Sequence, residues 1–97
     1  MISVERTDNC ITISGHAHYA EPGKDIVCAG ISALVQNLIQ SIEELTADKI
    51  QYTMLPGKVS IEFGDLSEHA QLLVSSFFVG AVAIAEAYPD NVHVTKH

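Results

Sequence analysis

Tryptophan is absent from this 97-residue sequence, and cysteine, proline and basic residues are scarce. The chain holds two cysteines and three prolines, and its five Lys plus Arg residues stand against twelve Asp plus Glu residues. The formal net charge is therefore −7. So few basic residues provide no patch that could neutralise a run of phosphates, and direct nucleic-acid binding is disfavoured. The same acidic charge would attract a basic protein partner.

The small number of cysteines indicates in which cellular compartment the protein works. Cys10 and Cys28 form no C-x-x-C motif and are too few for a disulfide framework. The first residues, MISVERTDNC, lack the basic flank and long apolar run of a secretory signal peptide. We therefore expect a cytoplasmic protein whose two thiols are free.

No uncharged run is long enough for a confident membrane span. The longest one, HAQLLVSSFFVGAVAIA at 69–85, is short and polar at its start, so a buried helix is expected and no membrane partner. Hydrophobic residues make up 47% of the chain and charged residues 18%, which is a globular composition. No linker or low-complexity segment divides the chain, and we expect one domain over residues 1–97.

Hydrophobic periodicity predicts five strands and two helices. The expected elements, in chain order, are strands at 2–6 and 10–15, a helix at 26–45, strands at 50–54 and 58–63, a helix that begins within the capping-box sequence DLSE at 65–68 and runs to about 88, and a strand at 91–96. The order β-β-α-β-β-α-β indicates an α+β fold in which two helices pack on a mostly antiparallel sheet.

The second expected helix is apolar on nearly every side. Phe77 lies on one apolar face, Val79 on another, and Phe78 and Val82 on a third. A domain this small can hardly cover all sides of one helix, and an uncovered apolar side indicates a partner. We therefore expect a homodimer whose interface includes this helix.

The chemistry-bearing residues lie around the loop 16–24. If Asp25 is the N-cap of the first helix, Cys28 lies in its first turn, where free backbone N–H groups and the positive end of the helix dipole favour a thiolate. The same N–H groups could stabilise an oxyanion. His16 ends the preceding strand, and the loop can bring it to Cys28. The pair would make a thiol-protease dyad with His16 as the base.

Other interpretations of these residues remain open. Cys28 could be a small buried hydrophobe and His16 merely solvated. A metal site built from His16, His18 and Cys28 is a further alternative, although it has only three ligands and no second cluster. Asp25 could orient His16 or only cap the helix, and capping is favoured because a carboxylate beside Cys28 would oppose the thiolate.

The stretch SGHAHYAEPGKDIVCAGISAL resembles the signature of the ribosomal-processing cysteine protease (Prp) family, in which a G-H motif is paired with a D-[IL]-V-C-A motif. The specific part covers residues 15–34, and the likeness in length and element order covers the whole chain. The resemblance implies a catalytic His16 and Cys28 and places the motif aspartate at Asp25. His18 is not part of the pattern. Ser32 projects on the same side of the helix as Cys28, and we expect it to support the site.

The same resemblance implies a small α/β homodimer without metal or cofactor. Its activity would be removal of a short N-terminal extension from a large-subunit ribosomal protein, by cleavage after an aromatic pair. The acidic charge suits such a basic substrate. The alternative function is a non-catalytic ribosome-associated or regulatory module, in which Cys28 is only a packing residue.

Glycines flank the loop 16–24, with Gly15 at its start and Gly23 near its end. We expect them to act as hinges of a mobile loop that lies over Cys28 until substrate displaces it. Substrate binding would then bring His16 within reach of Cys28, and in the free protein their separation can be long.

Overall fold

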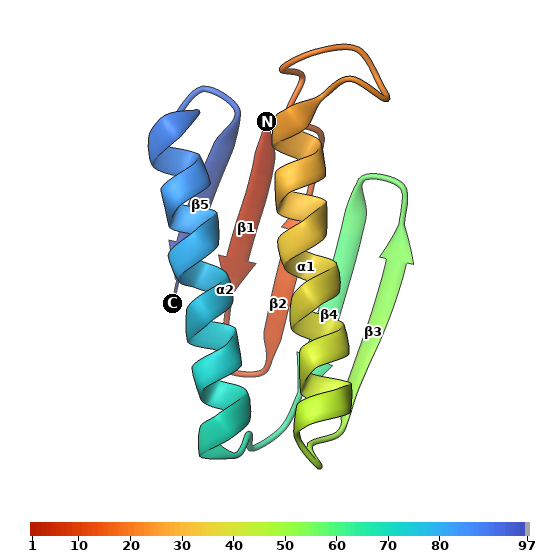
Figure 1. Ribbon diagram of the computed structural model, residues 1–97, viewed down its shortest axis with the longest axis vertical. Helices are drawn as coiled ribbons and strands as arrows, with labels where there is room; N and C mark the ends of the chain where they lie inside the picture. The colour runs from red at the N-terminus through yellow and green to blue at the C-terminus, as the bar shows by residue number, and fades with distance from the viewer. Residues whose placement is uncertain (97) are drawn as a thin grey trace.

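The elements follow one another in the predicted order, and the α+β class is confirmed (Figure 1). The computed structural model describes residues 1–96. Its elements are β1 (Ile2–Arg6), β2 (Cys10–Ser14), α1 (Ile26–Leu45), β3 (Ile50–Leu55), β4 (Lys58–Phe63), α2 (Glu68–Ala87) and β5 (Val92–Lys96). Each lies within a few residues of the range that the sequence indicates.

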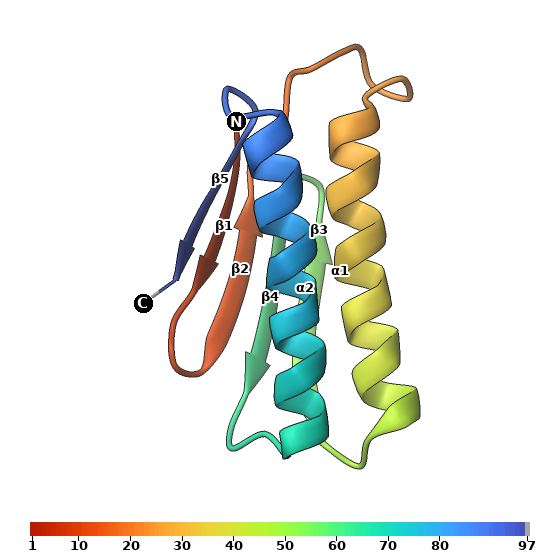
Figure 2. The same ribbon diagram turned by 60° about the vertical axis from the view of Figure 1, so that its left-hand side comes forward.

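The five strands form one sheet in the order β3-β4-β2-β1-β5. The pairs β3–β4, β4–β2 and β2–β1 are antiparallel, whereas β1 and β5 run parallel. Both helices lie side by side on the same face of the sheet, so the molecule has two layers (Figures 1 and 2). The loop 16–24, orange in Figure 1, rises beyond the N-terminal end of α1.

The core lies between the sheet and the helices because apolar residues alternate along the strands. In β2 the side chains of Ile11 and Ile13 are buried, while those of their neighbours along the strand are only half-buried. Helix α1 contributes a stripe at helical spacing, which consists of Val27, Ile31, Val35, Leu38, Ile39 and Ile42. The first turn of α1, which carries Cys28, is thus fixed on the sheet by Val27 and Ile31.

The second helix begins within the stretch DLSE, as predicted. Its N-cap is Ser67, whose hydroxyl accepts from the Ala70 N–H at 3.2 Å, and α2 starts at Glu68. Asp48 holds the cap residue in place: its carboxylate accepts from the Ser67 hydroxyl at 2.6 Å and from the Ser67 N–H at 2.8 Å. These two bonds hold the pKa of Asp48 below its ordinary value, the hydroxyl having the larger effect.

The apolar sides of α2 are covered to different degrees within one chain. Phe78 is 2% exposed and packs edge-to-face on Phe77, so it belongs to the core. Val82 is half-buried. The uncovered apolar side instead carries Leu72 and Val79, which are 69% and 73% exposed.

Length and composition alone would let both helices cross a bilayer. In the structure each packs an apolar stripe on the sheet, and α1 also contacts α2. This packing is typical of the core helices of a globular domain.

Candidate active site

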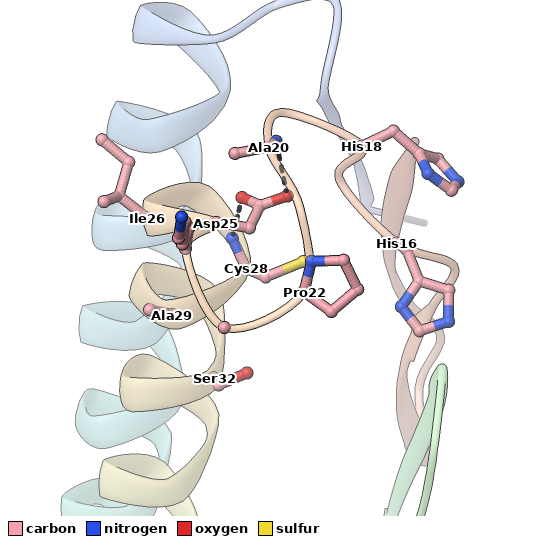
Figure 3. A pocket seen from close by; sticks show the side chains of 11 residues that line it. His16, His18, Ala20, Pro22, Asp25, Ile26, Cys28, Ala29 and Ser32 are labelled. Carbon is pink, nitrogen blue, oxygen red and sulfur yellow. Dashed lines mark hydrogen bonds between the residues drawn. The ribbon is translucent and has the colours of Figure 1, made fainter.

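Asp25 organises the start of α1 through its two carboxylate oxygens. Oδ1 accepts from the N–H groups of Val27 and Cys28, both at 3.0 Å. Oδ2 reaches back into the loop and accepts from the N–H groups of Tyr19 at 3.0 Å and Ala20 at 3.3 Å. Asp25 is therefore the helix cap, as predicted, and it also fastens the loop to the helix (Figure 3).

The alternative in which Asp25 orients His16 finds no support in the geometry. All four hydrogen bonds of the Asp25 carboxylate go to backbone N–H groups, and within residues 1–96 none joins it to the His16 ring. Capping of α1 is thus the role that the geometry gives to Asp25, the aspartate of the motif.

These donors make Asp25 a source of acid sensitivity. They hold the pKa of the Asp25 carboxyl below its ordinary value of 3.8, with the Cys28 N–H contributing most. Because the folded pKa is depressed, the stabilisation is fully present above pH 3.8 and is lost as the pH falls through the folded value. We expect Asp25→Asn to unfold at a lower temperature than wild type at neutral pH. This difference in unfolding temperature should become smaller as the pH is lowered.

The measurement is thermal unfolding by circular dichroism over a pH series. Asp8→Asn serves as the control, because Asp8 is an exposed turn residue without a side-chain hydrogen bond in the described chain. A gap between wild type and Asp25→Asn that stayed constant across the pH series would contradict the expected role of the carboxylate.

Three consecutive N–H groups at the start of α1, those of Val27, Cys28 and Ala29, are occupied, which narrows the choice of oxyanion donors. Val27 and Cys28 donate to the Asp25 side chain, and the Ala29 N–H donates to the Asp25 carbonyl at 3.0 Å. They are therefore not free to stabilise an oxyanion. The sulfur of Cys28 instead accepts from the Ala17 N–H at 3.4 Å. The sequence does not predict this donor, since a backbone group in a loop leaves no side-chain signal.

His16 lies on the strand side of the loop, apart from the cysteine. Its exposed ring packs over the β3–β4 turn, where a methyl group added to Gly57 would lie 2.9 Å from its Nε2 atom. In Figure 3 neither His16 nor His18 points its ring at the sulfur of Cys28. Across residues 1–96 no hydrogen bond joins His16 to Cys28, and the expected closure on substrate binding stays a prediction.

The metal alternative loses its basis. In the described part of the chain no group of three or more His, Cys, Asp and Glu side chains could hold a metal ion. The rings of His16 and His18 lie with their centroids 6.0 Å apart and at 64° to each other. His18 also has a positive φ of 54°, which directs its side chain differently from that of His16.

The two candidate hinge glycines lie in different surroundings. Gly15 has a φ of 89°, its N–H donates to the Gly57 carbonyl at 2.9 Å, and a Cβ there would collide with the Met1 carbonyl oxygen. Gly23 has a φ of 86° and nothing within 4 Å of an added Cβ. The close packing at Gly15 is that of a fixed turn, so the hinge prediction remains open only for Gly23.

Two hollows meet at Cys28. One, of about 630 Å³, lies under the loop and is lined by loop residues that include Pro22 and Lys24. The other, of about 340 Å³, extends toward the β3–β4 hairpin. His16, Cys28 and Ser32 line both hollows. An extended chain could therefore pass across the sulfur, and Ser32, one turn after Cys28 on α1, lies on its path (Figure 3).

Comparison with known proteins agrees with this geometry. A family model described as cysteine protease Prp matches residues 1–93. The ribosomal processing cysteine protease Prp of Mycoplasma genitalium is 32% identical over 98 residues, which cover 99% of this chain and 96% of the relative. The protein of the same name from Staphylococcus aureus strain Mu50 is 33% identical over 103 residues, covering 97% of each chain.

The fold comparison is equally extensive. The crystal structure of an essential ribosomal processing protease Prp from S. aureus, in complex with a covalently linked product peptide, superposes with a TM-score of 0.93 at 29% identity and covers 100% of both chains. A structure of that protease with a substrate peptide gives a TM-score of 0.83 at 26% identity, over 99% of this chain and 97% of the other.

Proposed function

The chain belongs to the cysteine protease Prp family, and on that premise we propose that it removes a short N-terminal extension from a large-subunit ribosomal protein precursor. The protein is a cysteine protease. The observation that carries the proposal is the placement of Cys28 at the positive end of α1, in contact with an N–H donor and between two hollows.

The reaction would proceed through a thioester. His16 takes the proton of the Cys28 thiol, and the sulfur attacks the carbonyl carbon of the scissile peptide bond. The C–N bond then breaks, and the leaving amine takes the proton from His16. In the second half of the reaction His16 deprotonates a water molecule, which attacks the thioester and releases the extension. For this His16 must rotate toward Cys28, which its exposed position permits.

The surroundings of Cys28 suit an apolar peptide. Three large hydrophobic side chains that line the two hollows are exposed: Ile26 (59%) at the start of α1, and Met54 (48%) and Leu55 (59%) on the hairpin. Such exposed apolar groups gain stability when an aromatic pair of a substrate covers them. The net charge of −7 complements a basic ribosomal protein, and we place the reaction in the cytoplasm.

A synthetic peptide that spans the junction of the extension tests the proposed specificity. We expect cleavage directly after the aromatic pair, and we expect loss of cleavage when both aromatic residues are alanine. Mass spectrometry of the products measures the cleavage. Equal cleavage of both peptides would contradict the proposed recognition of the aromatic pair.

The loop 16–24 would act as a gate in two parts. Its first part is held by the bonds from Tyr19 and Ala20 to Asp25 and by the edge-to-face contact of Tyr19 with Tyr88. The tip 21–24 is exposed and closes on itself through the Lys24 N–H and the Glu21 carbonyl, at 2.9 Å. We propose that only this tip moves when the substrate enters, with Gly23 as its hinge.

A homodimer would cover the exposed apolar side of α2. Leu72 and Val79 lie two turns apart on that side. We expect Val79→Asp to raise the dimer dissociation constant by roughly a hundredfold or more, because an unpaired charge in an apolar interface costs on the order of several kcal/mol. Leu45→Asp is the control, since Leu45 is 70% exposed but lies at the end of α1.

Analytical ultracentrifugation of the three proteins at micromolar concentration measures this effect. A monomeric wild type would refute the dimer. Equal dissociation constants for the two variants would contradict the placement of the interface on α2.

A further inference from the structure

We propose that Asn91 is a positioning residue for the active site: by holding the Ala17 carbonyl, it keeps the Ala17 N–H against the sulfur of Cys28. The inference rests on the proposed catalytic roles of His16 and Cys28. Asn91 lies in the turn between α2 and β5, far along the chain from the residues that it would position. It acts through the backbone of Ala17.

Asn91 is itself firmly placed. Its N–H donates to the Tyr88 carbonyl at 3.0 Å, and its carbonyl accepts from the Ile2 N–H at 2.8 Å. One bond ties it to the end of α2 and the other to the first residue of β1, an inner strand of the sheet. Its side-chain Nδ2 then donates to the Ala17 carbonyl at 2.9 Å in a half-buried setting. A side chain held in this way can fix a loop residue in turn.

Ala17 is clamped from three directions. Its carbonyl is held by Asn91, its N–H points at the Cys28 sulfur at 3.4 Å, and its side chain is 1% exposed. The neighbouring residues of the loop are exposed. Ala17 is therefore a point at which the loop is attached to the core, and within residues 1–96 the Asn91 amide is the one side-chain donor that bonds it.

The position of the Ala17 backbone affects both proposed catalytic residues. The N–H that contacts Cys28 belongs to the peptide group that joins His16 to Ala17. An N–H directed at sulfur stabilises the thiolate, because it places a positive partial charge next to the developing negative one. The same peptide group fixes the backbone from which the His16 ring must swing. Loss of the Asn91 bond would therefore weaken the nucleophile and misplace the base together.

The test compares alkylation of the two cysteines by iodoacetamide across a pH series, read by peptide mass spectrometry. Asn91→Asp keeps the size of the side chain and the backbone bonds but removes the donor, and Asn91→Ala removes both. Asp90→Asn, in the same turn and without a side-chain bond in the described chain, is the matched control. Cys10, on β2, reports any general loosening of the fold.

For Asn91→Asp we expect the Cys28 alkylation profile to move to higher pH by about one unit and kcat to fall roughly tenfold or more, with KM changed much less. Asp90→Asn and the reactivity of Cys10 should match wild type. A folded Asn91→Asp variant with the wild-type profile and kcat would overturn the proposal. Failure of both Asn91 variants to fold would also overturn it, since Asn91 would then be purely structural.

The role of Cys28 as nucleophile and the positioning role of Asn91 can be disproved separately. If Cys28 of the wild-type protein reacts no faster than Cys10, the proposed nucleophile is wrong. If wild-type Cys28 reacts faster and Asn91→Asp leaves this unchanged, only the positioning role is wrong.

Discussion

Cys28→Ala is expected to abolish cleavage of the precursor, with a loss of roughly 10⁴-fold or more in kcat, while the protein stays folded. The sulfur is the atom that would form the thioester, and an alanine leaves nothing to attack the carbonyl carbon. Folding should survive because Cys28 is only half-buried at the start of a helix whose cap is provided by Asp25. Cys28→Ser should be nearly inactive too, since a hydroxyl is far less acidic than a thiol.

Cleavage assays with circular dichroism on the same samples measure this effect. Cys10→Ala is the matched control, because Cys10 is the other free, half-buried cysteine and lies at the opposite end of β2 from His16. It should cleave like wild type. A folded Cys28→Ala protein that still trims the precursor would remove Cys28 from the mechanism.

His16→Ala is expected to lower kcat by about 10²–10⁴-fold, the usual effect of losing a general base. His18→Ala should have a much smaller effect, although its ring lies only 6.0 Å from that of His16. The two residues are chemically alike, both exposed and two positions apart, so they form a matched pair. The comparison thus isolates the role of His16 from the general loss of an imidazole.

Steady-state kinetics on both histidine variants measures the difference. Equal effects of the two substitutions would contradict the assignment of His16 as the base. A loss of wild-type activity on adding a chelator would also contradict a metal-free dyad.

Local signals in the sequence predict most of the fold because they act over a few residues. The alternation in β2 and the spacing in α1 each follow from one apolar face on a regular element. Asp25 before an apolar helical stretch predicts a cap, and its carboxylate indeed accepts from the Val27 and Cys28 N–H groups. The cap in turn predicts Cys28 in the first turn of the helix.

The missed features all depend on partners far away along the chain. The exact start of α2 depends on Asp48, which lies between α1 and β3 and accepts two hydrogen bonds from Ser67. A helical pattern does not tell whether Phe78 faces the core or a partner, because its burial depends on the packing of α2 beside β5, which also brings the Lys96 side chain over its ring. Asn91 in a P-D-N turn reads as an ordinary turn residue, and only the three-dimensional structure brings its amide to Ala17.

The central claim is that this chain uses Cys28 to cut an extension from a ribosomal protein. Its most direct test is incubation with an unprocessed large-subunit ribosomal protein, followed by mass measurement of the intact products. The account predicts two products, the shortened protein and an N-terminal peptide that ends in an aromatic pair, and it predicts neither with Cys28→Ala. An unchanged precursor mass with the folded wild-type protein, or the same cleavage with Cys28→Ala, would contradict it.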